Sequence, residues 1–342
     1  DLYNYSPPAH DDVLVSTQAL DLAVEAEPSG LAASLQLSGS WFLPEGLDGD
    51  RRSRRLVPTP FTTTALLGPH DRFVRFETTI DNRTRDHRLR VRVETGRQTN
   101  THYADSAFAV LSREQQAYDP ADFSIEVPAA VAPMQRFVTV EDAEAGATLL
   151  SIGLPEYELV HDSGGRLCLT LLRCVGELAK EGLRMRPGGR SGWVFETPEG
   201  QCPGPHAFRW AFLPHGSGWS GEIGRIHEAA EAFLVPPVVH AGQGEAAGAD
   251  RPVLALDPPA LVLSAFKAAD DGDGLVVRVY NPTPAPVTGT LRFFDGVEAV
   301  HRAGLDETPG AALSLDEGGV LRDTWPPFRI HTYRAAWRPE DR

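Results

Sequence analysis

Residues 87–95 read His-Arg-Leu-Arg-Val-Arg-Val-Glu-Thr, and this stretch decides the fold class. Its apolar residues alternate with charged ones, which is the period of two that a half-buried antiparallel strand shows. A second run of this kind covers residues 72–80, and the residues between the two runs, 81–86, are typical of a turn. We therefore predict a β-hairpin with one apolar and one charged face.

Strand-like runs recur along the chain, at residues 13–18, 31–37, 61–67, 147–152, 166–172, 206–213, 261–267, 275–280, 288–294 and 328–334. Only one segment indicates a helix: it follows Ser220, a suitable N-cap, and ends at Pro236. Many strands and one helix predict an all-β fold with antiparallel sheets stacked as a sandwich.

A linker is predicted at residues 236–252, which are small, polar and rich in residues that break helices and strands. It separates a large β domain, residues 1–235, from a smaller one, residues 253–342. The smaller part holds several strand-like runs spaced by Asp-Gly and Asn-Pro turns. This pattern favours a small immunoglobulin-like β-sandwich.

The composition excludes some partners. The chain has 342 residues, of which 42% are hydrophobic, so it can bury a core. Its 47 acidic and 32 basic side chains give a formal charge of -15, which repels the phosphates of nucleic acid. No apolar run is long enough to span a membrane. The sequence begins at Asp1 without an initiator Met, so we expect a chain that is processed or cut from a longer one.

The three cysteines, Cys168, Cys174 and Cys202, cannot all pair, and their spacing fits neither a zinc site nor a disulfide framework. We expect free thiols in a reducing compartment, and hence a cytoplasmic protein.

The residues themselves indicate no catalytic site. There is no Gly-rich phosphate loop, no Gly-x-Ser-x-Gly motif and no helical His pair. Glu156 and Glu158 would face the same side of a strand, where solvent is the commoner environment. The six tryptophans include Trp193, Trp210 and Trp219, which would suit a sugar-stacking platform, although burial in the core is the commoner fate.

Several short strings occur in an order that resembles a known family. They include Leu-Tyr-Asn-Tyr-Ser-Pro-Pro at 2–8, Tyr-Ala-Asp at 103–105, Gly-Leu-Pro-Glu-Tyr-Glu at 153–158, Leu-Thr-Leu-Leu-Arg at 169–173 and Arg-Val-Tyr-Asn-Pro at 278–282. In this order the strings resemble the C-terminal half of glycoside hydrolase family 38. That family comprises retaining α-mannosidases and a bacterial branch with mannosylglycerate hydrolases. The resemblance covers nearly the whole chain.

The resemblance implies a galactose-mutarotase-like supersandwich followed by a smaller sandwich. Family members carry their zinc ligands and nucleophile in an N-terminal α/β barrel, and nothing here resembles that barrel. We therefore expect no cofactor in this chain, with zinc in the barrel of the parent polypeptide. The expected function is that of a non-catalytic β region that supports the barrel and lines its sugar cleft. The expected partners are this barrel and a mannose-containing carbohydrate.

Three residues are candidates for contact with substrate. In the family an Arg downstream of the Asp-containing strand motif lies near the sugar, and the position that matches it is Arg113. Arginine suits sugar hydroxyls because its planar fork donates several hydrogen bonds. Tyr3 and Tyr5 could also face a sugar cleft, although an aromatic residue near a cut terminus more often packs against a missing neighbour. We expect no catalytic residue and no metal ligand.

Two other functions remain open. One is a free-standing carbohydrate-binding module that uses exposed Trp or Tyr rings. The other is an aldose-epimerase-like enzyme, which needs a Glu base and His acids on one cleft, with His87, His102, His206 and Glu156 as candidates. A chain that has lost its barrel should also expose a large apolar surface, or hide it in a homo-oligomer.

Overall fold

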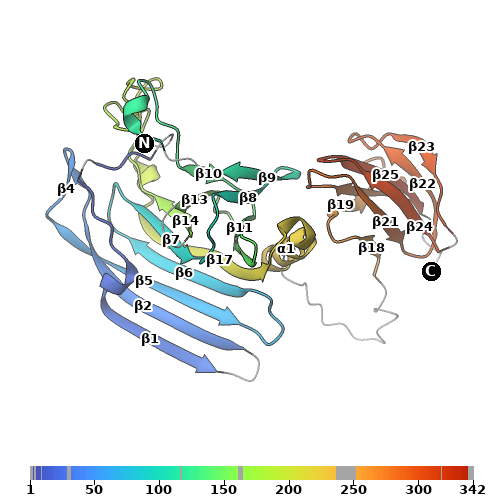
Figure 1. The fold of residues 1–342 in the computed structure, drawn as a ribbon, viewed down its shortest axis with the longest axis horizontal. Helices are drawn as coiled ribbons and strands as arrows, with labels where there is room; N and C mark the ends of the chain where they lie inside the picture. The colour runs from blue at the N-terminus through green and yellow to red at the C-terminus, as the bar shows by residue number, and fades with distance from the viewer. Residues whose placement is uncertain are drawn as a thin grey trace. The chain divides into compact units, whose positions relative to one another are not determined.

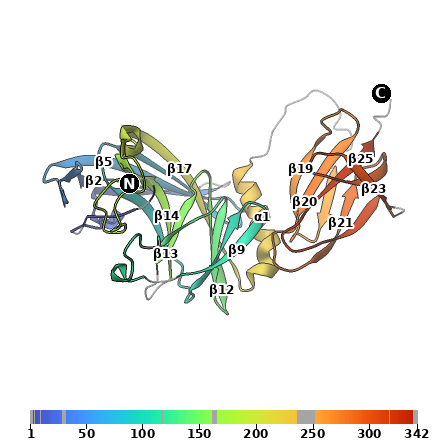
Figure 2. The same cartoon turned by 90° about the horizontal axis from the view of Figure 1, so that it is seen from above.

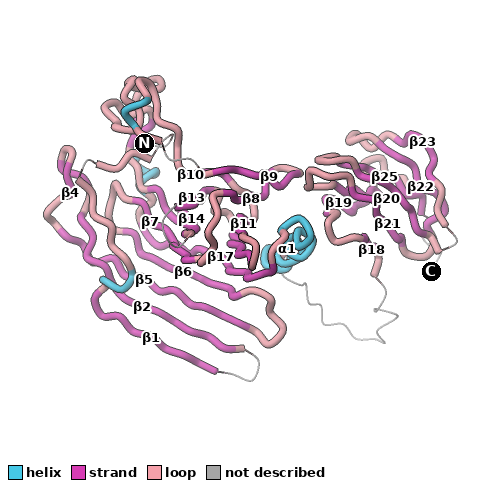
Figure 3. Tube along the Cα trace, in the orientation of Figure 1, coloured by secondary structure: helices cyan, strands magenta, loops and turns pink. Residues whose placement is uncertain are grey.

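The computed structural model describes residues 3, 5–8, 10–28, 32–115, 118–160, 165–235, 252–316 and 318–337. The chain divides into two compact units, one of residues 1–104 and 112–215, the other of residues 105–111 and 216–342. Strands dominate both, as Figure 3 shows, which confirms the predicted all-β class.

The largest element is an antiparallel sheet of nine strands (Figure 1). In spatial order the strands are β1 (Leu20–Pro28), β2 (Ala33–Pro44), β5 (Leu56–Leu67), β6 (Val74–Asn82), β17 (Gly204–Gly216), β12 (Ala145–Ser151), β11 (Phe137–Glu141), β8 (Thr101–Ser106) and β9 (Ala109–Glu114). Strand β1 is therefore one edge of the sheet.

A sheet of four antiparallel strands packs on part of the nine-stranded sheet, in the order β10 (Val131–Pro133), β13 (Glu156–Val160), β14 (Arg166–Arg173) and β7 (Arg88–Glu94). Alternation along each strand turns one row of apolar side chains inward. Leu89, Val91 and Val93 of β7 pack there against Leu169 and Trp210, in a core to which both sheets contribute side chains. The apolar face predicted for residues 87–95 is thus confirmed.

The predicted hairpin between residues 72–80 and 87–95 is wrong, although both strands exist. Strand β6 pairs with β5 on one side and with β17 on the other, so it has no free edge. Strand β7 instead pairs with β14 in the other sheet. The turn-like residues between β6 and β7 therefore carry the chain from one layer of the sandwich to the other.

Buried polar contacts fix this crossing. The Asn82 side chain, which is only 1% exposed, donates to the backbone carbonyls of Gln201 at 2.9 Å and Cys202 at 2.7 Å. Gln201 in turn exchanges two hydrogen bonds with Asp86, each of 2.8 Å. His87 lies beside the buried thiol of Cys174, 3.6 Å from its sulfur.

The second unit contains a smaller sandwich (Figure 2, orange to red). One sheet has the order β18 (Leu254–Asp257), β21 (Val287–Phe293) and β24 (Val320–Trp325). The other has the order β19 (Val262–Ala268), β20 (Leu275–Tyr280), β25 (Ile330–Trp337), β22 (Val297–Ala303) and β23 (Pro309–Leu313). Trp325 and Tyr333 are fully buried in its core.

The same unit includes helix α1 (Trp219–Leu234) and the tip of the β8–β9 hairpin. The ring of Phe108 meets Tyr280 edge-on, with 5.3 Å between centroids, and the Val110 amide donates to the carbonyl of Pro282. The buried side chain of Asn281 donates to three backbone carbonyls, as Asn82 does to two in the first unit.

Short elements complete the fold: β3 (Leu47–Asp48), β4 (Arg51–Arg52), β15 (Glu177–Leu178), β16 (Phe195–Glu196) and the 3-10 turns η1 (Ser16–Gln18), η2 (Pro120–Asp122) and η3 (Pro198–Gln201). The strand predicted at 13–18 is wrong, because η1 occupies its end. The helix prediction is right but its start is not. Helix α1 begins at Trp219 after Gly218, whose φ of 85° favours glycine.

The predicted domain boundaries, 1–235 and 253–342, stay a prediction. The two compact units are divided differently: helix α1 and residues 105–111 belong to the unit that contains the C-terminal residues. The predicted linker 236–252 lies, except for Pro252, outside the described residues. In the part of the chain that the structure describes, no helix is long and apolar enough to cross a membrane.

Part of the apolar face of the nine-stranded sheet is exposed. The strand register places Val24, Leu35 and Leu67 on the same face as the core residue Phe61. They are nevertheless 64%, 48% and 43% exposed, so the four-stranded sheet does not cover this end of β1, β2 and β5. The large apolar surface, or the homo-oligomer that hides it, which we expect of a chain without its barrel, stays a prediction.

Replacing Asn82 by Ala should test the crossing. The substitution leaves two partly buried carbonyls without the donor that Asn82 provides, so we expect the free energy of unfolding to fall by about 1–3 kcal/mol. Urea denaturation measures it. The matched control is Asp81→Asn, which removes only an exposed ion pair with Arg83 and should cost less than about 1 kcal/mol. Equal losses for the two variants would contradict this role for Asn82.

Candidate functional site

Arg113 is held by a buried tyrosine. It lies on β9, and its guanidinium donates to the hydroxyl of Tyr157 on β13, at 3.2 Å. The same hydroxyl is 2.8 Å from Nδ1 of His102 on β8. Tyr157 is fully buried and His102 is 5% exposed. The three side chains thus join the two sheets of the large sandwich through one phenol oxygen.

The direction of these hydrogen bonds follows from the chemistry of the groups. Arginine can only donate, so the phenol oxygen of Tyr157 accepts from Arg113. Burial, and then the charge of Arg113, lower the pKa of His102 to about 4, so its ring is neutral at pH 7. The hydroxyl of Tyr157 can then donate to Nδ1 of His102. Burial also raises the pKa of Tyr157, which keeps its proton on the oxygen.

This cluster fixes the position of one cation, the guanidinium of Arg113. Its tyrosine and histidine are neutral and bonded to each other, so neither is ready to act as a base. Among the described residues, Tyr157 is the one hydrogen-bond partner found for Arg113, which is half-buried. A guanidinium has five N–H donors, so further donors remain for a ligand. Sequence reasoning selected Arg113 but missed Tyr157 and His102 as its partners.

Tyr5 and the two predicted glutamates lie elsewhere, on the outer face of the four-stranded sheet. Glu156 and Glu158 share that face, as predicted, and both are ion-paired with arginines rather than fully solvated. The ring of Tyr5 covers the guanidinium of Arg88, 3.9 Å from the ring centroid. Neither Tyr5 nor Tyr3, which is 61% exposed, is bonded to Arg113 in the described structure.

Of the three predicted tryptophans, the two whose side chains are described, Trp193 and Trp210, do not form one platform. Trp210 is a core residue, 5% exposed and stacked on Phe76. Trp193 is 78% exposed, with the guanidinium of Arg190 5.9 Å from its ring centroid. Trp219 begins helix α1.

The four epimerase candidates do not converge. Tyr157, which holds His102, points into the core, and the adjacent Glu156 therefore points to the opposite face of β13. His206 bonds the carbonyl of Cys202, and His87 lies beside Cys174. The common cleft that an epimerase requires is not formed by these side chains.

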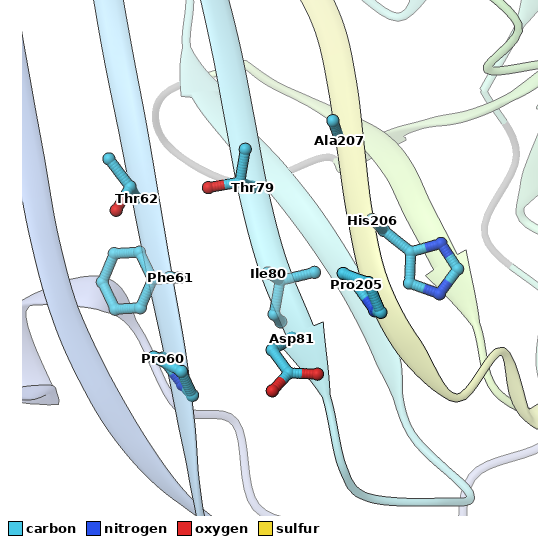
Figure 4. Close-up of a pocket in the computed structure, with 9 residues that line it drawn as sticks. All are labelled: Pro60, Phe61, Thr62, Thr79, Ile80, Asp81, Pro205, His206 and Ala207. Carbon is cyan, nitrogen blue, oxygen red and sulfur yellow. The ribbon is translucent and has the colours of Figure 1, made fainter.

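An open, shallow depression of about 440 Å³ lies over β5, β6 and β17, as Figure 4 shows. Its one carboxylate is that of Asp81, which pairs with Arg83. Thr62 and Thr79 also line the depression and are its two residues with a hydroxyl group. It contains none of the three residues of the Arg113 cluster, so it does not extend that site.

The described residues also do not fit a zinc ion. No group of three or more His, Cys, Asp or Glu side chains is placed to hold a metal in this part of the chain. All three cysteines are free thiols, and burial raises the pKa of Cys174 to about 12, which disfavours the thiolate that binds zinc.

Removing Arg113 should change the titration of His102. Because the charge of Arg113 helps to lower the pKa of His102, Arg113→Gln should raise that pKa. A pH titration of the His102 ring by NMR measures it. Arg92→Gln is the control, since Arg92 pairs with Glu94, and it should leave the titration unchanged. An unmoved His102 midpoint in Arg113→Gln would contradict the cluster as described.

Acid should destabilise the fold through two histidines. Burial lowers the pKa of His87 and of His102 from 6.5 to about 4, so the unfolded state binds protons more readily between these values. Stability is therefore full above pH 6.5 and falls as the pH drops toward 4. Urea midpoints between pH 7 and 4.5 measure this slope. His102→Gln should show a shallower slope, and an unchanged slope would contradict the assignment.

Comparisons with known proteins fit this fold. The family model described as glycosyl hydrolases family 38 C-terminal domain matches residues 5–177. A second, the glycosyl hydrolases family 38 C-terminal beta sandwich domain, matches residues 260–333. A putative mannosylglycerate hydrolase of Halalkalibacterium halodurans is 30% identical over 295 residues, which are 80% of this chain and 30% of that protein.

Two solved structures from Enterococcus faecalis are similar as well. One is described as a protein in glycosyl hydrolase family 38, with a TM-score of 0.71, 27% identity, and coverage of 92% of this chain and 36% of the other. The other is described as an α-mannosidase, with a TM-score of 0.70, 27% identity, and coverage of 92% and 35%. This chain thus spans about a third of the length of the relatives that it matches. From the two family matches and the shared fold, we conclude that the chain belongs to glycoside hydrolase family 38, with the family's C-terminal domain and C-terminal β-sandwich domain.

Proposed function

We propose that this chain is the non-catalytic β region of an α-mannosidase-like glycosidase. In this proposal it supports a separate catalytic part that carries the zinc ion, and Arg113 helps to line the cleft for a mannose-containing substrate. The observation that carries the proposal is the hydrogen bond that fixes Arg113 on the buried hydroxyl of Tyr157. A cation held in place and left with spare N–H donors suits recognition of sugar hydroxyls.

The rest of the site supports a binding role over a chemical one. Retaining glycosidases act with two carboxyl groups about 5–5.5 Å apart, one of them a nucleophile. Arg113 is bonded to the neutral phenol of Tyr157, which is bonded in turn to the neutral imidazole of His102. Glu156 and Glu158 lie on the other face of β13 and are occupied by arginines. The catalytic carboxylates of the proposed enzyme would therefore come from the separate part.

Hydrolysis of 4-nitrophenyl α-mannoside by the purified chain, with and without zinc, tests the absence of catalysis. We expect no turnover in either condition, because the described residues offer neither a carboxylate pair at Arg113 nor a metal cluster. Zinc-dependent turnover that persists through repurification would contradict the proposal.

Binding of methyl α-mannoside tests the role of Arg113. We expect weak, saturable changes in the NMR signal of His102, which Arg113→Gln should weaken by about tenfold or more through loss of a charged hydrogen-bond donor. Trp193→Ala is the comparison that separates the two binding functions. The exposed ring of Trp193 favours a carbohydrate-binding module as the second candidate. Binding that depends on Trp193 and not on Arg113 would support that module instead.

A further inference from the structure

The outer face of β7, β13 and β14 carries an excess of positive charge on a strongly acidic chain. We call it the arginine face and define it by Arg88, Arg90, Arg92, Arg166, Arg173, Glu94, Glu156 and Glu158. These five arginines and three glutamates, all among the described residues, have a combined formal charge of two positive units, whereas the whole chain has -15. Such a local reversal of sign attracts anions.

Short residues in the middle strand let the long side chains lie flat. Cys168 and Thr170 on β14 face the same side as the arginines and are buried beneath them. The strand register places Arg92 opposite Cys168, and Arg90 opposite Thr170. The guanidinium of Arg90 can therefore reach across β14 to Glu158 on β13.

One carboxylate serves two guanidinium groups at the most buried part of this face. The oxygen Oε2 of Glu158 lies 2.5 Å from Arg90 and 3.4 Å from Arg88. The side chains of Arg88 and Glu158 are only 11% and 17% exposed. Each guanidinium has five N–H donors, so a single carboxylate cannot match both in charge or in hydrogen bonds. Burial, and then the nearby charge of Arg90, lower the pKa of Arg88, while the charge of Glu158 acts in the opposite direction.

The ring of Tyr5 covers one face of Arg88 and so limits the access of water to it. An anion gains more from a partly buried cation than from an exposed one, because solvent screens the pair less. Arg92 and Arg166 also share one carboxylate, that of Glu94. The side chains of Arg92 and Glu94 are 46% and 50% exposed, so solvent screens their charges more strongly than those of Arg88 and Glu158.

We propose that Arg88 and Arg90, beneath Tyr5, bind an oxyanion group of a small ligand, either a carboxylate or a phosphate. Guanidinium groups bind both of these groups with paired hydrogen bonds. The incoming oxyanion would supply the negative charge that Glu158 alone cannot supply. This site lies apart from Arg113 and does not depend on the proposed function, since a neutral mannoside carries no such group.

Calorimetric titration of the purified chain at low salt tests the site. The probes are D-glucuronate for a carboxylate, inorganic phosphate for a phosphate, and methyl α-mannoside as a neutral sugar. We expect saturable binding of at least one anion, weakened by added salt, and no competition from the neutral sugar. The stronger anion identifies the class of ligand. A chain that shows no saturable binding of either anion overturns the proposal.

Variants distinguish this site from a purely structural ion pair. Arg90→Gln should weaken anion binding by about tenfold or more, whereas Arg92→Gln, its control on the same strand, should change it by less than about threefold. Glu158→Gln should act in the opposite direction and tighten anion binding, because it removes the carboxylate that competes for both arginines. Glu94→Gln is the control for that change.

The variants also keep the test decisive if one of them folds poorly. Circular dichroism of each variant, with and without anion, reports the folded fraction, and bound anion should raise the midpoint of thermal unfolding of Glu158→Gln most. Equal binding by Arg90→Gln and Arg92→Gln would overturn the site. So would anion binding that Glu158→Gln leaves unchanged or weakens.

Discussion

The large sandwich depends on how its chain passes from one layer to the other, and Asn82 controls that passage. Strand β6 is enclosed by β5 and β17, so the chain must leave its sheet when β6 ends. At that point two backbone carbonyls of the segment before β17 are partly buried and need donors. The amide of Asn82 supplies both, and Asp86 and Gln201 close the same junction. A buried amide can satisfy such groups without the desolvation penalty of a charge. The smaller sandwich uses Asn281 in the same way, where β20 ends.

The sequence predicts the strands better than their partners, for a physical reason. Alternation along residues 87–95 reports that one side of a strand is buried, and β7 is such a strand. It does not report which neighbour forms the hydrogen bonds, because that depends on residues far along the chain. The turn-like segment 81–86 suits a hairpin and a passage between layers equally well. The start of α1 differs from the prediction because its N-cap is Gly218, which has a left-handed backbone conformation and no capping side chain, and not Ser220.

The candidate site was predictable only in part. Arg113 came from the resemblance to a family, and no local pattern marks it as special. Its partner Tyr157 could have been found from the alternation at residues 156–158, which turns the tyrosine inward when both glutamates face outward. A buried tyrosine needs a partner for its hydroxyl, which is a signal for a polar cluster. The identity of that partner was out of reach, because His102 and Arg113 lie on two strands of the opposite sheet. The same alternation that buries Tyr157 places Glu156 and Glu158 on the outer face of the four-stranded sheet, together with the arginines of β7 and β14.

Strand β1, the exposed edge of the nine-stranded sheet, has a further consequence for how the chain behaves at high concentration. Its backbone could in principle extend the sheet with another chain, and its inward side carries the exposed Val24. Its other side carries Glu25 and Glu27, which are both exposed. Two copies joined edge to edge would bring four such carboxylates together on one surface, and like charges on neighbouring strands repel. Acidic residues on an edge strand thus act against fibril-like assembly, which natural sheets commonly oppose with charge. Part of the chain's large negative charge therefore lies where it keeps separate molecules apart.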